Sequence, residues 1–147
     1  MHLEGIYTLK TARIKVWDFI SDPKEIAKCL PGLEKFEARD TKSFSVTLKV
    51  GISFVKGDFK FTFNLLEQTP PSNSRFEAIG KSAGVSVHLI ASIDLHELEP
   101  TVTELAWKAD TELGGLLVEL SPSLLELSTS KFTQNFFECV KTKLEAD

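Results

Sequence analysis

Apolar and polar residues alternate with a period of two through most of the central chain. In residues 57–65 (GDFKFTFNL), apolar side chains fall at every second position, with polar or charged ones between them. The same alternation runs through residues 43–50, 85–95 and 103–111. Because successive side chains of a strand point to opposite faces, the pattern predicts strands with a single apolar face. Turn-forming residues separate the runs and favour an antiparallel meander, namely Gly57, the segment 70–74 (PPSNS), Gly84 and Pro100.

Two short helices are predicted ahead of this meander. A first strand is expected at residues 3–9, and Thr11 then offers an N-cap for ARIKVWDFI, where apolar residues recur at roughly helical spacing. Asp22 and Pro23 mark a second start, because Asp caps helix N-termini and Pro is tolerated at the first helical position.

The second helix is expected to stop abruptly before the next strand. It ends near Cys29, because Leu30 precedes a proline and is pushed toward an extended conformation. Gly32 can then adopt the positive φ that turns the chain. The stop therefore lets the chain reverse from a helix into the sheet.

From about residue 122 to residue 144 the apolar period becomes helical. Ser121 ahead of Pro122 is one candidate N-cap, and Ser123 with Glu126 as a capping box is another. One side of this helix carries Leu124, Leu125, Ser128, Phe132, Asn135, Phe136 and Cys139. The helix can cover the apolar face of the sheet, which would curl around it. The predicted fold class is α+β, in a single domain over residues 1–147.

Charge and cysteine content narrow the partners and the location. A formal net charge of −4, without a cluster of Lys and Arg, argues against nucleic acid as a partner. Cys29 and Cys139 lie far apart without CxxC spacing, so we expect neither a disulfide framework nor a thiolate metal site. Cys29 is interpreted as a small buried side chain, and a reducing cytoplasm is the expected location.

No membrane-spanning segment or secretory signal is expected. Residues 1–10 lack a cationic start followed by an apolar run, and the longest apolar run, at 113–118, is too short to span a bilayer. Any membrane contact is therefore predicted to be peripheral, at the inner face of the cell membrane. No cofactor is indicated, and the oligomeric state is left open, a homodimer included.

The titratable residues give little support for catalysis. Of the histidines, His88 and His96 share the polar face of one strand with Asp94, where a surface ion pair or a weak metal pair is conceivable. A nucleophilic triad needs a His base within reach of a Ser or Cys. The inward faces are nearly free of titratable residues, so we predict no catalytic group and no metal site.

The inward phenylalanines fit either an ordinary core or a ligand cavity. Small inward residues such as Ala91 and Ala109 stand opposite large aromatic ones, which favours a cavity. Ser128 and Asn135 fall within the apolar stripe of the long helix, where an unpaired polar group costs about 1–3 kcal/mol. A ligand or water can satisfy them, or Ser128 can bond to a carbonyl of its own helix. The predicted ligand-binding residues are Phe59, Phe61, Phe63, Phe76, Leu89, Leu105, Trp107, Leu124, Ser128, Phe132, Asn135 and Phe136.

Several motifs resemble one known family. The segment VWDFISDPKEIAKCLPGLEKF resembles the signature of CoxG, the family of G-type subunits of carbon monoxide dehydrogenase, in which V-W and D-P pairs lead to a C-L-P-G turn. Residues 49–59, 103–117 and 135–140 resemble later segments of that family, so the resemblance covers nearly the whole chain. It places the chain in the START-like, polyketide cyclase-like (SRPBCC) superfamily. It implies a helix-grip fold, a curved antiparallel sheet wrapped around a long C-terminal helix, with two short helices after the first strand.

The resemblance also implies a hydrophobic-ligand pocket between the sheet and the long helix. Family members have been connected with maturation or membrane recruitment of molybdenum-containing carbon monoxide dehydrogenases, and with quinone-like lipids. They often carry a C-terminal extension associated with membrane attachment, whereas this sequence ends at Asp147. By analogy, the short second helix can act as a lid, and its lysines can contact anionic headgroups. The gate residues implied are Lys24, Lys28, Leu30, Pro31, Gly32, Gly114 and Leu117.

Three functions follow as hypotheses. The first is a non-enzymatic carrier of a lipid or quinone-like molecule. The second is an assembly or recruitment factor for a molybdenum hydroxylase-type enzyme that acts through its surface. The third is a polyketide cyclase or dehydratase, which would need an inward acid or base.

Overall fold

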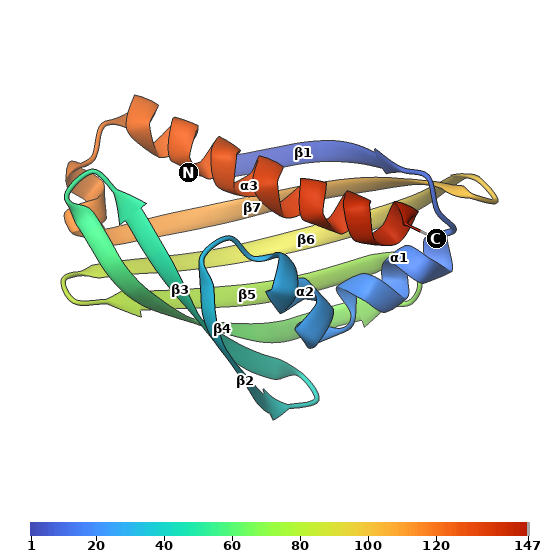
Figure 1. The fold of residues 1–147 in the computed structure, drawn as a ribbon, viewed down its shortest axis with the longest axis horizontal. Helices are drawn as coiled ribbons and strands as arrows, with labels where there is room; N and C mark the ends of the chain where they lie inside the picture. The colour runs from blue at the N-terminus through green and yellow to red at the C-terminus, as the bar shows by residue number, and fades with distance from the viewer. Residues whose placement is uncertain (147) are drawn as a thin grey trace.

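Seven antiparallel strands form one sheet in the order β1-β7-β6-β5-β4-β3-β2, and a long helix lies across one face of it (Figure 1). The computed structural model describes residues 1–146. The strands are β1 (His2–Leu9), β2 (Leu33–Asp40), β3 (Ser43–Ile52), β4 (Val55–Thr69), β5 (Asn73–Ser82), β6 (Val85–Glu99) and β7 (Val102–Gly115). The helices are α1 (Arg13–Ile20), α2 (Pro23–Cys29), the short 3-10 helix η1 (Leu116–Glu119) and α3 (Pro122–Glu145). The predicted α+β helix-grip architecture is confirmed.

The register of the sheet places the predicted apolar rows on one face. Ala91 pairs with Ala109 and Ile93 with Trp107 across β6 and β7, so their side chains share the face that α3 covers. At one end of β6, Leu95 packs in a core cluster with α1 and β1 residues. At the other end, Val85 packs in a second cluster beneath η1. Two further clusters lie between α2 and β3 and between the two short helices and α3.

The abrupt stop of α2 has the predicted cause. The Asp22 carboxylate accepts a hydrogen bond from the Lys24 N–H at 3.0 Å, with Pro23 in the first turn. Leu30 is extended, and Gly32 has a φ of +77°. A Cβ at Gly32 would lie 2.5 Å from the Lys49 carbonyl oxygen, so close backbone approach also requires glycine here.

Ser121 is the N-cap of α3, because its hydroxyl accepts a hydrogen bond from the Leu124 N–H at 3.2 Å. The alternative cap at Ser123 is therefore wrong. The most deeply buried residues of α3 are Phe137 and Val140, neither of which belongs to the predicted stripe. The Phe137 ring stacks on Tyr7 with ring centroids 4.2 Å apart. The buried face is therefore rotated from the predicted one in the second half of the helix.

Two local predictions differ from the structure. The turn between β3 and β4 falls at residues 53–54, where Ser53 has a φ of +54°, and Gly57 lies inside β4. The N-cap of α1 is Ala12, without a side-chain bond. Thr11 instead is buried, and its carbonyl oxygen accepts a hydrogen bond from the Thr103 hydroxyl at 2.8 Å. Tertiary contacts at these positions override the local signal.

The expectation of two unlinked cysteines is wrong. Cys29, the last residue of α2, forms a disulfide with Cys139 of α3, and their Cα atoms are 5.5 Å apart. The two residues are 110 positions apart in sequence and meet only because α2 packs against α3. Lasting disulfides are uncommon in a reducing cytosol, so the cytoplasmic location stays a prediction.

Candidate functional site

A cavity of about 800 Å³ lies between the inner face of the sheet and α3. It extends over strands β3 to β7 and is bordered by α2 and by the first half of α3. Leu89 and Ala91, in the middle of β6, line this space rather than a packed cluster. A volume of this size is within the range of small-molecule sites in proteins, about 300–1,000 Å³.

Phenylalanine rings form a continuous aromatic wall on one side of the cavity. Phe44 and Phe63 stack with centroids 4.8 Å apart, and Phe63 lies 6.2 Å from Phe76. Phe59 and Phe61 continue the row at 6.1 Å. A Cβ at Gly80 would overlap the Phe61 ring, so glycine leaves the space that this ring fills. The wall can accommodate a flat or an extended apolar molecule.

Most of the predicted ligand-binding residues line the cavity, namely Phe59, Phe61, Phe63, Phe76, Leu89, Trp107, Ser128, Phe132, Asn135 and Phe136. Two do not. Leu105 is fully buried in the cluster around Leu9 and Val16. Leu124 packs in the other cluster, beside Leu117 and Leu120. Leu105 of β7 and Leu124 of α3 belong to the packed clusters at the two ends of the molecule, where the sheet and the helices are in direct contact.

Four predicted gate residues line the cavity, namely Leu30, Pro31, Gly32 and Leu117. Lys24 and Lys28 belong to α2 and do not line it, and the exposed Lys28 ammonium pairs with the Glu25 carboxylate at 3.3 Å. Gly114 faces away, because a Cβ there would overlap the Ser86 hydroxyl oxygen. The part of the border that comes from α2 and the turn after it is therefore apolar.

The polar groups at the cavity differ from those predicted. Asn135 is exposed and Ser128 half-buried, so neither needs a ligand to satisfy it. It is Thr129 that bonds to its own helix, its hydroxyl donating to the Leu125 carbonyl oxygen at 2.8 Å. Among the described residues, the Ser92 Oγ, Trp107 Nε1 and Thr111 Oγ1 atoms are buried and lack a hydrogen-bond partner, and all three residues border the cavity.

Several lining residues are absent from the set predicted from the sequence. Trp17 and Ile26 come from the two short helices, Phe44 from β3, Thr111 from β7 and Phe137 from α3. Thr111 continues the inward row of Leu105, Trp107 and Ala109 by one step of the period of two. The strand pattern therefore contains the signal for Thr111, whereas the contribution of α1 and α2 depends on tertiary packing.

The histidines lie outside the cavity, on the outer face of the sheet. The His88 Nε2 atom is 2.8 Å from the Glu77 carboxylate, and Asp94 accepts a hydrogen bond from the Asn73 amide at 2.7 Å. The conceivable Asp94–His96 pair is not seen among the described residues. Over residues 1–146, no Asp, Glu or His side chain lines the cavity.

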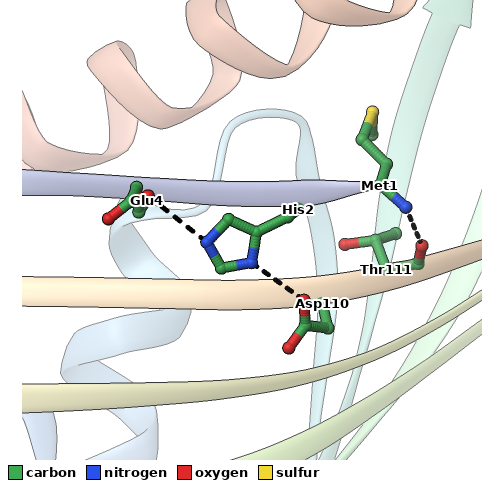
Figure 2. A network of polar contacts seen from close by, with 5 residues as sticks. All are labelled: Met1, His2, Glu4, Asp110 and Thr111. Atoms are coloured by element: carbon green, nitrogen blue, oxygen red, sulfur yellow. Dashed lines mark hydrogen bonds and ion pairs between the residues drawn. The ribbon is translucent and has the colours of Figure 1, made fainter.

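His2 joins the edge strand β1 to its neighbour β7 on that outer face, as Figure 2 shows. Its Nδ1 atom lies 2.8 Å from the Asp110 carboxylate and its Nε2 atom 3.4 Å from that of Glu4. The hydrogen bond with Asp110 raises the pKa of His2 above its ordinary value. Nearby, the Met1 ammonium donates to the Thr111 carbonyl oxygen at 2.7 Å (Figure 2).

A second hollow, of about 460 Å³, lies where the end of β1 and the start of α1 meet the end of α3. Its lining is largely polar and includes Lys10, Lys15 and Lys143. This composition contrasts with the apolar lining of the larger cavity, which is the better candidate for an apolar ligand. In the described part of the chain, no helix combines the length and the apolar composition needed to cross a membrane.

Comparison with solved structures gives the same fold over almost the whole chain. A conserved protein from Geobacillus kaustophilus is 22% identical with a TM-score of 0.91, covering 98% of this chain and 95% of that one. An aromatase/cyclase, Zhui, from Streptomyces sp. R1128 is 18% identical with a TM-score of 0.72, covering 99% and 93%. A START superfamily protein from Mycobacterium smegmatis is 9% identical with a TM-score of 0.72, covering 98% and 97%. At these identities the likeness shows the START-like fold alone.

The sequence comparison is more specific. No curated protein sequence matches the chain. The model of the CoxG family, the G-type subunits of carbon monoxide dehydrogenase, matches residues 5–145, which include both short helices, all of the meander and α3. The chain therefore belongs to the CoxG family, and it has the START-like fold.

Proposed function

We propose that this protein binds and carries a hydrophobic small molecule, a lipid or a quinone-like compound, without transforming it. The observation that carries the proposal is the cavity of about 800 Å³, with an aromatic wall and an apolar border on α2. Burial of apolar surface would supply the affinity, at about 25 cal/mol per Å² before ordering costs.

The chemistry of the lining supports carriage rather than catalysis. A cyclase or dehydratase needs a proton donor or acceptor next to its substrate. The titratable side chains that line this cavity within residues 1–146 are Lys42, Lys49 and Lys131, all of them exposed residues at its border. The deep part is formed by aromatic and aliphatic side chains with isolated neutral polar groups. The likeness to a structure named as an aromatase/cyclase, at 18% identity, does not by itself support that activity here.

A second function is favoured by a separate observation, the exposed apolar side chains at one end of the molecule. The β3–β4 turn, η1 and the start of α3 meet there (Figure 1), and Phe54, Val118 and Leu127 are between 56% and 68% exposed. Clustered exposed apolar residues mark contact surfaces in soluble proteins. We propose that this end of the protein binds a carbon monoxide dehydrogenase-type enzyme, or a membrane surface, and so acts in recruitment.

Native mass spectrometry tests the carrier function. The protein is purified under non-denaturing conditions, and any released molecule is identified after denaturation. We expect a mass above that of the chain and a lipid or quinone in the released fraction. The variant Ala91→Phe should block the cavity and lose the added mass, whereas His96→Phe, an exposed change on the same strand, should retain it.

The result that would overturn the carrier function is a clean apo mass, together with no thermal shift when ubiquinone or menaquinone analogues are added. The recruitment function then becomes the leading explanation. It is tested by replacing Phe54 and Val118 with Ser and measuring loss of binding to the purified partner enzyme or to vesicles.

A further inference from the structure

Two buried hydrogen-bonding atoms without partners lie on β7, on the wall of the cavity. They are the Trp107 indole Nε1 and the Thr111 hydroxyl oxygen, and both residues line the cavity. Such atoms are uncommon in folded proteins, because burying an unpaired polar group costs free energy that a partner restores. Ser92 of β6 also borders the cavity and has a third atom of this kind. Its side chain alternates with those of Ala91 and Ile93, however, and therefore points to the outer face of the sheet.

The surroundings of Thr111 offer no protein partner for its hydroxyl. The residue is 8% exposed, it pairs with Leu89 across the sheet, and Ala109 and Leu113 flank it on the same face. All three of these side chains are apolar. The polar main-chain groups of Met1 beside it are already bonded to the main chain of Thr111, at 2.7 and 2.8 Å. Thr111 borders the cavity, and rotation about its single Cα–Cβ bond is enough to turn the hydroxyl toward it. A valine has nearly the same shape, so the hydroxyl contributes nothing to packing that a methyl group would not.

The Trp107 indole is held in place by its neighbours rather than by its N–H group. It lies over Gly5 of β1, where a Cβ would come within 2.7 Å of the Nε1 atom. Its ring is 6.0 Å from that of Phe137 on α3. The indole N–H can only donate a hydrogen bond. A buried indole N–H usually finds an acceptor, and this one has none among residues 1–146, although the rest of the Trp107 side chain is only half-buried.

We infer that β7 carries the polar contact of the cavity, in which the Thr111 hydroxyl and the Trp107 N–H donate to oxygen acceptors of the bound molecule. The inference rests on the proposed carrier function. It narrows the ligand to an apolar molecule that carries a carbonyl, carboxyl or similar acceptor oxygen, and it disfavours plain hydrocarbons and molecules whose polar group only donates. The polar contact is thus assigned to the sheet, rather than to Ser128 and Asn135 of α3.

Matched probes test this assignment by equilibrium dialysis. 9-Fluorenone and fluorene have nearly the same shape, but only fluorenone has a carbonyl oxygen. For Thr111→Val we expect fluorenone to bind about two- to tenfold more weakly, as for the loss of one hydrogen bond, with fluorene unchanged. Thr111→Ser keeps the hydroxyl and should bind both probes as the unmodified protein does. Trp107 is four residues, about 13 Å along the strand, from Thr111, so the single carbonyl of fluorenone contacts one donor at a time. Trp107→Phe should therefore weaken fluorenone less than Thr111→Val does, with fluorene again unchanged.

A second measurement does not depend on a ligand. In the ligand-free protein, Thr111→Val should raise the melting temperature, because it removes an unpaired buried hydroxyl, whereas Thr111→Ser should not. An equal loss of both probes in Thr111→Val, or no loss of fluorenone in either Thr111→Val or Trp107→Phe, overturns the assignment while leaving the carrier function standing. If neither probe binds the unmodified protein and no lipid copurifies with it, the carrier function fails, and the assignment fails with it.

Discussion

His2 shows how a single exposed side chain connects the edge strand β1 to the sheet. Its ring lies between the carboxylates of Glu4 on β1 and Asp110 on β7 (Figure 2). Both ring nitrogens are donors only when the histidine is protonated. The hydrogen bond with Asp110, helped by the charges of Asp110 and Glu4, raises the pKa of His2, and desolvation opposes it.

The raised pKa predicts the direction of a pH effect. A group that binds its proton more tightly in the folded state stabilises the fold below its unfolded pKa, about 6.5 for histidine. That contribution is lost as pH rises through the higher pKa of the folded state. We expect an NMR titration to give His2 a pKa above 6.5, and Asp110→Asn to lower it. Asp58→Asn, an exposed change on the far strand β4, is the control, and an unchanged His2 pKa in Asp110→Asn would contradict the prediction.

At the scale of elements, the disulfide is the covalent link between α2 and α3. Cys29 ends the short helix α2, and the residues that follow it, Leu30 to Gly32, border the cavity. Around the bond, Phe19 and Val140 are buried in one small cluster. The link therefore holds the element proposed as a lid against the helix that covers the sheet.

Removing this link should destabilise the protein. Cross-linking residues that enclose a long loop restricts the unfolded chain, and loss of such a bond typically costs about 2–5 kcal/mol. We expect Cys29→Ala with Cys139→Ala to lower the free energy of unfolding in urea by this amount, and to speed ligand exchange. The reduced unmodified protein should match the double variant. Two titratable thiols in the native protein under oxidising conditions would contradict the disulfide itself.

How much of each element could be predicted depended on whether its signal is local. The strand faces followed from the period of two, and the Asp22-Pro23 start and the Gly32 turn followed from backbone preferences alone. The β3–β4 turn at Ser53 was missed because Gly57 is the stronger local turn signal, although strand pairing carries β4 past it. The buried face of α3 was only partly found, since Tyr7 of β1 decides that Phe137 packs inward.

At the scale of the whole molecule, the cavity and the disulfide both depend on contacts between distant parts of the chain. Cys29 and Cys139 are 110 residues apart, and no spacing rule connects them. Phenylalanines on the strand faces were visible in the sequence, but the same pattern describes a filled core. The structure separates the two outcomes, because Leu105 and Leu124 are packed whereas Leu89 and Ala91 border empty space.

The contrast between packed ends and an open cavity implies that the fold gives up stability to keep the cavity open. A substitution that fills the cavity tests this implication. Ala109 is buried, borders the cavity and pairs with Ala91, so a leucine there can extend into empty volume. Burial of its additional carbons at about 0.8 kcal/mol each should raise the free energy of unfolding of the ligand-free protein by up to about 2 kcal/mol.

Ligand affinity should fall at the same time in Ala109→Leu, by about tenfold or more, because the side chain occupies volume that the ligand needs. Urea denaturation and equilibrium dialysis measure the two effects on the same preparation. Lys108→Leu, an exposed change on the outer face of the same strand, should alter neither. A destabilised Ala109→Leu protein that binds the ligand normally would mean that Ala109 belongs to a packed core, and that the open space does not serve binding.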